Sequence, residues 1–151
     1  MKNYYCLITS DTKIKYATDI INSRLKEKKF PLYKKTPFLN EIKKNDDVVF
    51  YLAGTGENSQ SFVASAKISC VEIFNKTEVT DPDNKNQIVI KYLNFNNIKF
   101  FKKSVNIKSI FDNLNFIKNK KHYGANLVGG VAKINFDDFK IINKQLDQSM
   151  L

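Results

Sequence analysis

The sequence has few of the residues that build metal and redox sites. Its 151 residues include one histidine, two cysteines and no tryptophan. One histidine and two cysteines without CxxC spacing do not form the usual pattern of a zinc site. Cys6 and Cys70 lie in strand-like apolar stretches, where we expect buried free thiols; a disulfide or a shared metal is the alternative. We therefore expect no metal and no cofactor.

Long apolar runs are also missing. No stretch approaches the roughly 20 apolar residues that cross a bilayer. The opening MKNYYCLITS lacks the apolar core of a secretory signal. We expect a cytoplasmic protein that does not enter a membrane. The length suits one domain, which we place at residues 1–147, followed by a frayed tail at 148–151.

Positive charge is what the chain has in excess. The formal net charge is +10 and the sequence pI is about 9.5. A strongly basic surface favours nucleic acid or another polyanion as partner. The chain is also rich in Lys, Asn and Ile, so lysine bias from an AT-rich genome is a second explanation for the charge.

Hydrophobic periodicity predicts an α+β domain with about six strands and three or four short helices. Small residues at Ala64 and Ala66 allow the tight packing of a small, strongly bent barrel with helices outside. We expect the prolines to keep 30–37 irregular, and 75–86 to be a solvated loop. The strands are expected at 3–9, 48–53, 62–68, 87–95, 98–101 and 127–134. The main helices are expected at 13–28 and 104–114, and from Asn135 onward with Phe136, Phe139, Ile142 and Leu146 buried.

Two loops place aromatic rings beside lysines. The first, FPLYKKTP, contains Tyr33 next to Lys34 and Lys35, and the second, KNKKHYG, ends in Tyr123 and Gly124. An aromatic ring flanked by cations suits a nucleobase and its phosphates. The alternative is that the rings fill the core and the lysines face water.

Three stretches together resemble the EVE domain, a family of the PUA-like superfamily related to YTH domains. They are NYYCLITS followed by a helix, KKNDDVVFYLAGTG…SFVASAKI, and LNFIKNKKHYGANLVGGVAKINFDDFKII. The resemblance covers nearly the whole chain and implies a PUA-like barrel with a basic cleft. The sequence departs from the family pattern at Asp46, where glycine is usual, and at Tyr123, where tryptophan is usual.

The resemblance also implies a pocket in which aromatic rings enclose a modified base. Tyr123 takes the place of the family's tryptophan, and Phe30 or Tyr33 that of the aromatic residue after the first helix. The residues expected in the pocket are Thr9, Ser10, Phe30, Tyr33, Tyr51, Tyr123 and Asn126. Those expected to hold phosphates are Lys34, Lys35, Lys118, Lys120 and Lys121.

These features predict a non-catalytic module that binds DNA or RNA and recognises a modified base. Association with a nuclease or a modification system fits this hypothesis. One alternative is an enzyme acting on RNA or modified nucleosides, with His122 as general base beside Lys121. The other is a protein-interaction domain, in which the aromatic residues belong to the core.

Overall fold

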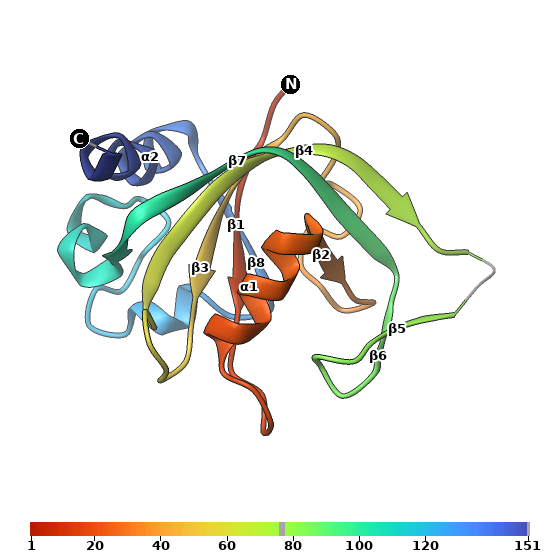
Figure 1. Ribbon diagram of the computed structural model, residues 1–151. Coiled ribbons are helices and arrows are strands. Elements are labelled where there is room, and N and C mark those ends of the chain that lie inside the picture. The colour runs from red at the N-terminus through yellow and green to blue at the C-terminus, as the bar shows by residue number, and fades with distance from the viewer. Residues whose placement is uncertain (76–77, 151) are drawn as a thin grey trace.

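A computed structural model describes residues 1–75 and 78–150, without the side chains of 146–150. Six strands form one curled sheet in the order β2-β7-β4-β3-β1-β8, and Figure 1 shows this sheet curving around α1. The strands are β1 Tyr4–Thr9, β2 Lys29–Leu32, β3 Asp47–Leu52, β4 Ser61–Ile73, β7 Lys91–Asn106 and β8 Val131–Ile134; β5 Val79–Asp81 and β6 Gln87–Val89 form a separate hairpin. The helices are α1 Ala17–Glu27 and α2 Phe136–Met150, with 3-10 turns η1 Ile107–Ser109, η2 Phe111–Asn113 and η3 Tyr123–Asn126.

This architecture confirms the α+β class and the six-stranded bent sheet. The sheet is a half-barrel, and two α-helices with three 3-10 turns replace the three or four short helices expected. The frayed tail expected at 148–151 and the buried Leu146 expected in the last helix cannot be compared with the structure. The side chains of residues 146–150 and all of Leu151 lie outside the described part of the chain.

The centre of the sheet is buried on both faces. β1 and β3 pair in parallel, and successive side chains point to opposite sides of the sheet. Tyr5, Leu7 and Phe50 join the core under α1. Cys6 and Tyr51 join a second core with Ile142 of α2. Two covered faces explain why the run from Val48 to Leu52 contains no charge.

The first helix begins four residues later than its apolar spacing predicts. The side chain of Asp11 accepts a hydrogen bond from Ala17 N at 2.8 Å, and Thr12 Oγ1 accepts one from Lys15 N at 3.1 Å. These bonds form a turn over residues 12–15, so α1 starts only at Ala17. Ile14 was expected in the buried stripe and is instead 78% exposed.

The hydrogen bonds of Asp11 make the stability of the turn before α1 depend on pH. Hydrogen bonds from Ala17 N and Thr55 N hold the pKa of its carboxyl below the ordinary value. The resulting stabilisation is complete above the unfolded-state pKa of about 3.9 and is lost as the pH falls through the lower folded-state pKa. We expect Asp11→Asn to lower the free energy of unfolding by about 1 kcal/mol at neutral pH, because a neutral amide accepts these hydrogen bonds more weakly than a carboxylate. Urea titrations should show this difference shrinking below about pH 4; an unchanged difference at low pH would contradict the assignment.

Three expected segments differ from the structure because distant pairing overrides local pattern. Residues 29–32 form an edge strand against β7, where Pro31 is tolerated because an edge strand has one unpaired side. The helix expected at 104–114 is the end of β7, paired with β4, followed by η1 and η2. The described part of the loop expected at 75–86 contains β5, which pairs with β6.

Two buried side chains expected from the sequence are exposed instead. Phe136, expected in the apolar stripe of the last helix, is 50% exposed. Cys70 is exposed too, at a register shift of β4, whereas Cys6 is buried as expected, and both thiols are free. Burial raises the pKa of the Cys6 thiol, so this thiol stays protonated.

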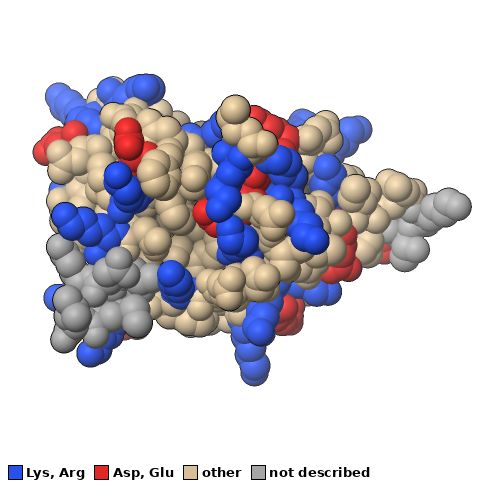
Figure 2. Space-filling model, turned by 90° about the horizontal axis from the view of Figure 1, so that it is seen from above, with Lys and Arg blue, Asp and Glu red and all other residues tan. Residues whose placement is uncertain are grey.

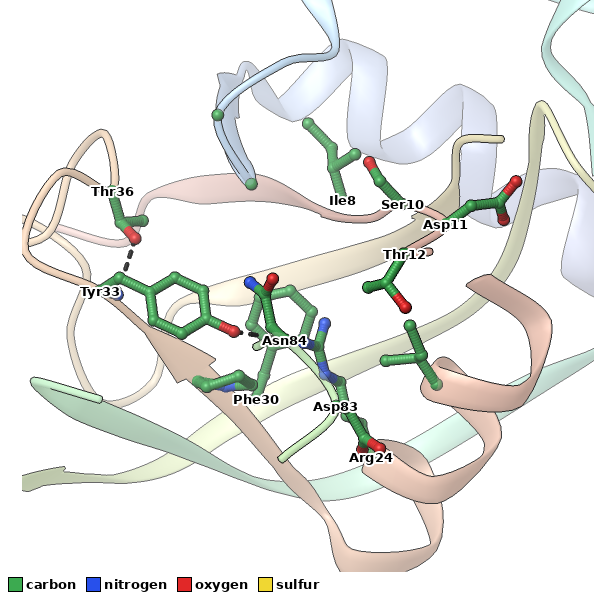
Figure 3. Close-up of a pocket in the computed structure, with 14 residues that line it drawn as sticks. Ile8, Ser10, Asp11, Thr12, Arg24, Phe30, Tyr33, Thr36, Asp83 and Asn84 are labelled. Carbon is green, nitrogen blue, oxygen red and sulfur yellow. Dashed lines mark hydrogen bonds between the residues drawn. The ribbon is translucent and has the colours of Figure 1, made fainter. Parts of the chain in front are cut away.

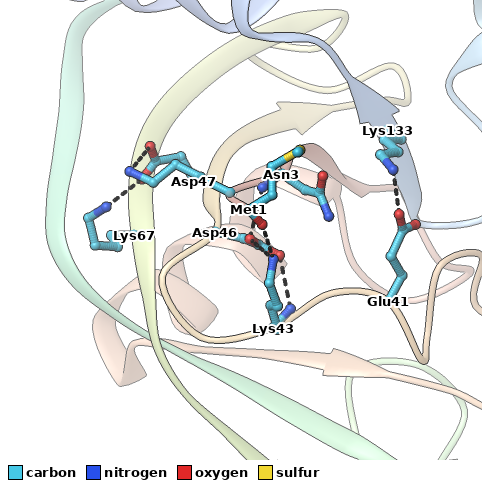
Figure 4. A network of polar contacts seen from close by, with 9 residues as sticks. Met1, Asn3, Glu41, Lys43, Asp46, Asp47, Lys67 and Lys133 are labelled. Atoms are coloured by element: carbon cyan, nitrogen blue, oxygen red, sulfur yellow. Dashed lines mark hydrogen bonds and ion pairs between the residues drawn. The ribbon is translucent and has the colours of Figure 1, made fainter.

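The start of β1 and β3 is held by ion pairs and hydrogen bonds (Figure 4). Asp46 is fully buried and accepts hydrogen bonds from Asn3 N at 3.0 Å and from Lys43 Nζ at 2.8 Å. Next to it, Asp47 pairs with Lys2 and Lys67. In Figure 2, acidic side chains lie beside several of the basic ones on the face seen from above. Part of the positive charge is therefore neutralised within the fold.

Candidate nucleic-acid interface

A cavity of about 230 Å³ opens beside the end of β1. The volume is below the roughly 300–1,000 Å³ of a pocket for a drug-sized ligand, so the cavity suits a single small heterocycle. Figure 3 shows side chains from several segments facing it. It is lined by Ile8, Ser10, Asp11, Thr12, Ile20, Arg24, Phe30, Pro31, Tyr33, Thr36, Asp83, Asn84, Gly129 and Gly130.

Arg24 is the buried cation of this cavity. Its guanidinium lies 4.8 Å from the centre of the Phe30 ring, a stacked arrangement that favours arginine. It also donates to Thr9 Oγ1 at 3.1 Å and pairs with Asp81 at 3.3 Å. The side chains of Arg24 and Asp81 are only 12% and 7% exposed. The pair therefore ties α1 to the end of β5.

Tyr33 supplies the half-buried aromatic wall. Its hydroxyl donates to Asp81 Oδ2 at 2.5 Å, and its backbone N–H donates to Thr36 Oγ1 at 2.8 Å. Burial, with the carboxylate of Asp81 beside it, raises the pKa of this hydroxyl, which therefore stays protonated. Both ends of the residue are fixed, so the ring has a defined orientation before any ligand binds.

Two glycines form another part of the cavity wall. Gly129 and Gly130 have φ values of +82° and +87°, a region that side chains rarely adopt. A Cβ on Gly129 would lie 3.1 Å from Pro37, and Gly130 O accepts a hydrogen bond from Ile8 N at 2.8 Å. The Gly-Gly pair thus lets the backbone itself line the cavity.

The cavity lining has mixed charge, and two lysines follow one of its walls in the chain, which we call the basic rim. Asp11 and Asp83 contribute carboxylates, and Asp83 pairs with Lys15. Lys34 and Lys35 are exposed and directly follow Tyr33. The interior can therefore form hydrogen bonds with a polar heterocycle, while the rim can contact a phosphate backbone.

The structure brings together some of the predicted pocket residues. The cavity is lined by Ser10, Phe30 and Tyr33. Thr9 does not line it but accepts a hydrogen bond from Arg24. Phe30 is 3% exposed, so most of its ring is covered, and one face of the ring supports the guanidinium of Arg24.

The other predicted pocket residues lie elsewhere. Tyr51 is fully buried in the second core, and its hydroxyl donates to Gln60 Oε1 at 2.9 Å. The half-buried ring of Tyr123 packs against Phe111 with ring centres 5.7 Å apart. Asn126 accepts a hydrogen bond from Lys118 N at 3.1 Å. None of Tyr51, Tyr123 and Asn126 lines the cavity.

The second basic loop is only partly available to a ligand. Lys118 and Lys121 are exposed. Lys120 turns inward, and its Nζ donates to the backbone oxygens of Phe111 and Leu114. His122 is exposed and its backbone N–H donates to Asn119 Oδ1 at 3.1 Å. Lys120 therefore holds the loop and is not placed to bind phosphate.

Sequence reasoning missed Arg24, Asp81 and Asn84. Arg24 falls near the end of the helix expected at 13–28, where a cation is favourable without any further role, and Asp81 falls in the loop expected at 75–86. One signal could have identified Arg24, because it is the only arginine among 25 basic residues. A chain that otherwise uses lysine keeps arginine where a planar, stacked donor is needed.

Two further kinds of site are not seen in the described part of the chain. Across residues 1–75 and 78–150, no group of three or more His, Cys, Asp and Glu side chains is arranged to hold a metal ion. Over the same ranges, no helix has the length and apolarity needed to span a bilayer.

The sequence model of the EVE domain matches residues 3–145. No match was found among curated proteins. The match therefore comes from the family pattern and covers nearly the whole chain.

Solved structures share this fold at low sequence identity. PSPTO5229 from Pseudomonas syringae is 12% identical with a TM-score of 0.62, covering 95% of this chain and 99% of its own. Human THYN1, solved in complex with 5-methylcytosine-containing DNA, is 9% identical with a TM-score of 0.54 and 99% coverage of both chains. The N-terminal domain of Staphylothermus marinus McrB is 8% identical with a TM-score of 0.53, covering 96% of this chain and 95% of its own. At these identities the comparison establishes the fold alone.

Proposed function

This chain belongs to the EVE domain family, and on that premise we propose that it is a non-catalytic nucleic-acid-binding protein that takes a modified base into the cavity beside β1. The observation that carries the proposal is the cavity itself. It joins an oriented tyrosine, a buried arginine and a basic rim in a space that suits one heterocycle.

Each part of the cavity has a role in this proposal. The ring of Tyr33 stacks on the base, while Ser10 and Asn84 form hydrogen bonds with its edge. Arg24 keeps the inner wall in place through Phe30 and Asp81. Lys34 and Lys35 contact the phosphates on either side. Stacking and edge contacts together offset the few kcal/mol needed to unstack a base.

Two structural neighbours support this choice of ligand. THYN1 was solved with DNA that contains 5-methylcytosine, and it has the same fold. A second neighbour is the N-terminal domain of an McrB protein. We therefore propose DNA as the first polymer to test and a methylated cytosine as the first base. Association with a nuclease or modification system is part of the same proposal.

The placement of His122 favours binding over catalysis. In the described part of the chain, the hydrogen bonds of His122 are made by its backbone, whose N–H donates to Asn119 Oδ1 and whose oxygen accepts from Ala125 N. No carboxylate is recorded there as its salt-bridge partner. A general base is normally oriented by such a partner. The proposal accordingly gives no chemical step to His122 or Lys121.

The proposal is tested by binding to matched oligonucleotides. Fluorescence anisotropy would compare DNA and RNA strands with and without 5-methylcytosine, 5-hydroxymethylcytosine or N6-methyladenine, at low and moderate salt. We expect one modified strand to bind about fivefold more tightly, since burying one added methyl group in a pocket contributes roughly 1 kcal/mol. That preference should survive added salt, whereas phosphate contacts weaken. Equal binding to all strands that disappears with salt would contradict the proposal.

A further inference from the structure

An exposed tip formed by residues 13–15, Lys-Ile-Lys, stands beside the cavity. Ile14 is 78% exposed, more than any other described large hydrophobic side chain except Met1. Lys13 and Lys15 on either side of it are exposed as well. The two residues before the tip, Asp11 and Thr12, line the cavity. The tip is therefore a continuation of the cavity wall.

The fold holds this tip in a fixed shape. Thr12 Oγ1 accepts hydrogen bonds from Ile14 N and Lys15 N, and Thr12 N donates to Lys15 O at 2.9 Å. Lys15 Nζ pairs with Asp83, which belongs to the segment between β5 and β6. Asp11 fixes the base of the tip through Ala17 and Thr55. An aliphatic side chain is thus held out into solvent by a network of polar bonds.

Such a side chain matches a need that base flipping creates. A base that leaves a duplex and enters a pocket leaves a gap in the stack. Proteins that open or bend a duplex fill such gaps with apolar wedges, isoleucine among them. A wedge must be rigid, apolar and close to the pocket that receives the base. Ile14 has these three properties, and the exposed Lys13 beside it is a cation that can contact a phosphate.

We propose that Ile14 inserts into the base stack of duplex DNA and fills the space vacated by the base held in the cavity. This inference rests on the proposed function. It adds the form of the polymer, a double strand opened at one position, which the cavity alone does not specify. A single strand has no closed stack to hold open, so the wedge contributes to duplex binding only.

The experiment compares Ile14→Ala with wild type on one modified strand, alone and in its duplex. We expect affinity for the duplex to fall about tenfold and affinity for the single strand to change less than about twofold. Ile14→Leu should keep most of the duplex affinity, because leucine is also an apolar wedge. Ile73→Ala is the matched control, since Ile73 is 56% exposed and does not line the cavity.

The outcomes separate this inference from the proposed function. Equal affinities of wild type and Ile14→Ala for the duplex would overturn the wedge and leave the base pocket in place. Equal losses on duplex and single strand would also overturn it, because the tip would then be an ordinary contact surface. If wild type binds neither form selectively, the proposed function fails and the wedge fails with it.

Discussion

Replacing Arg24 with alanine is expected to lower the free energy of unfolding by about 3 kcal/mol and to abolish selective base binding. Asp81, whose side chain is 7% exposed, would lose its cationic partner and keep the hydroxyl of Tyr33. Removing one member of a buried ion pair leaves an uncompensated charge, which costs more than the pair itself contributes. The face of Phe30 would also lose the group stacked on it.

The matched control for Arg24→Ala is Lys133→Ala. Lys133 pairs with Glu41, but these side chains are 40% and 38% exposed. Pairs exposed to this extent contribute about 0–1 kcal/mol. Urea unfolding would compare both variants with wild type. If Arg24→Ala cost no more than Lys133→Ala, the buried pair would not be what holds the cavity together.

Tyr33→Ala is expected to weaken binding of the modified strand by about tenfold to a hundredfold. Stacking of one base on an aromatic ring contributes about 1–3 kcal/mol, and Tyr33 is the tyrosine that lines the cavity. Tyr33→Phe keeps the ring and loses the hydroxyl, which donates to Asp81 and accepts a long hydrogen bond from Arg24 at 3.5 Å. It should therefore reduce stability by about 1 kcal/mol and preserve most of the affinity.

Tyr123→Ala is the comparison that decides between two tyrosines. Resemblance to the family places Tyr123 in the pocket, whereas the structure packs its ring on Phe111. We expect Tyr123→Ala to leave the affinity for the modified strand within about twofold of wild type, as measured by the same anisotropy assay. A larger loss for Tyr123→Ala than for Tyr33→Ala would move the binding site to the second basic loop.

The central strands could be predicted from the sequence because their signals are local. The uncharged run from Val48 to Leu52 indicated a strand covered on both faces, and the alternation from Phe62 to Ile68 indicated its partner. Both strands are present, paired antiparallel. The family was also identifiable from three motifs, and the match over residues 3–145 confirms it.

The cavity could not be assembled from the sequence because its contacts join distant segments. Arg24 meets Asp81 across 57 positions, and Asp11 meets Thr55 across 44. Helical periodicity places Arg24 near the end of α1, where a favourable dipole already explains a cation. The role of Tyr123 stays a prediction, because its position before Gly124 matches the family motif while its ring packs against Phe111 outside the cavity. Local pattern predicts the central strands, and long-range polar pairs decide what faces the cavity.

The most direct test of the central claim is an NMR titration of the ¹⁵N-labelled protein with an oligonucleotide that carries the preferred modified base. If the base enters the cavity, the largest shift changes occur at Ser10, Arg24, Tyr33 and Asn84, and at Gly129 and Gly130. The unmodified strand should shift signals of the basic rim and leave those of the cavity nearly unchanged. Shifts centred on residues 118–123, with the cavity signals unmoved, would contradict the account.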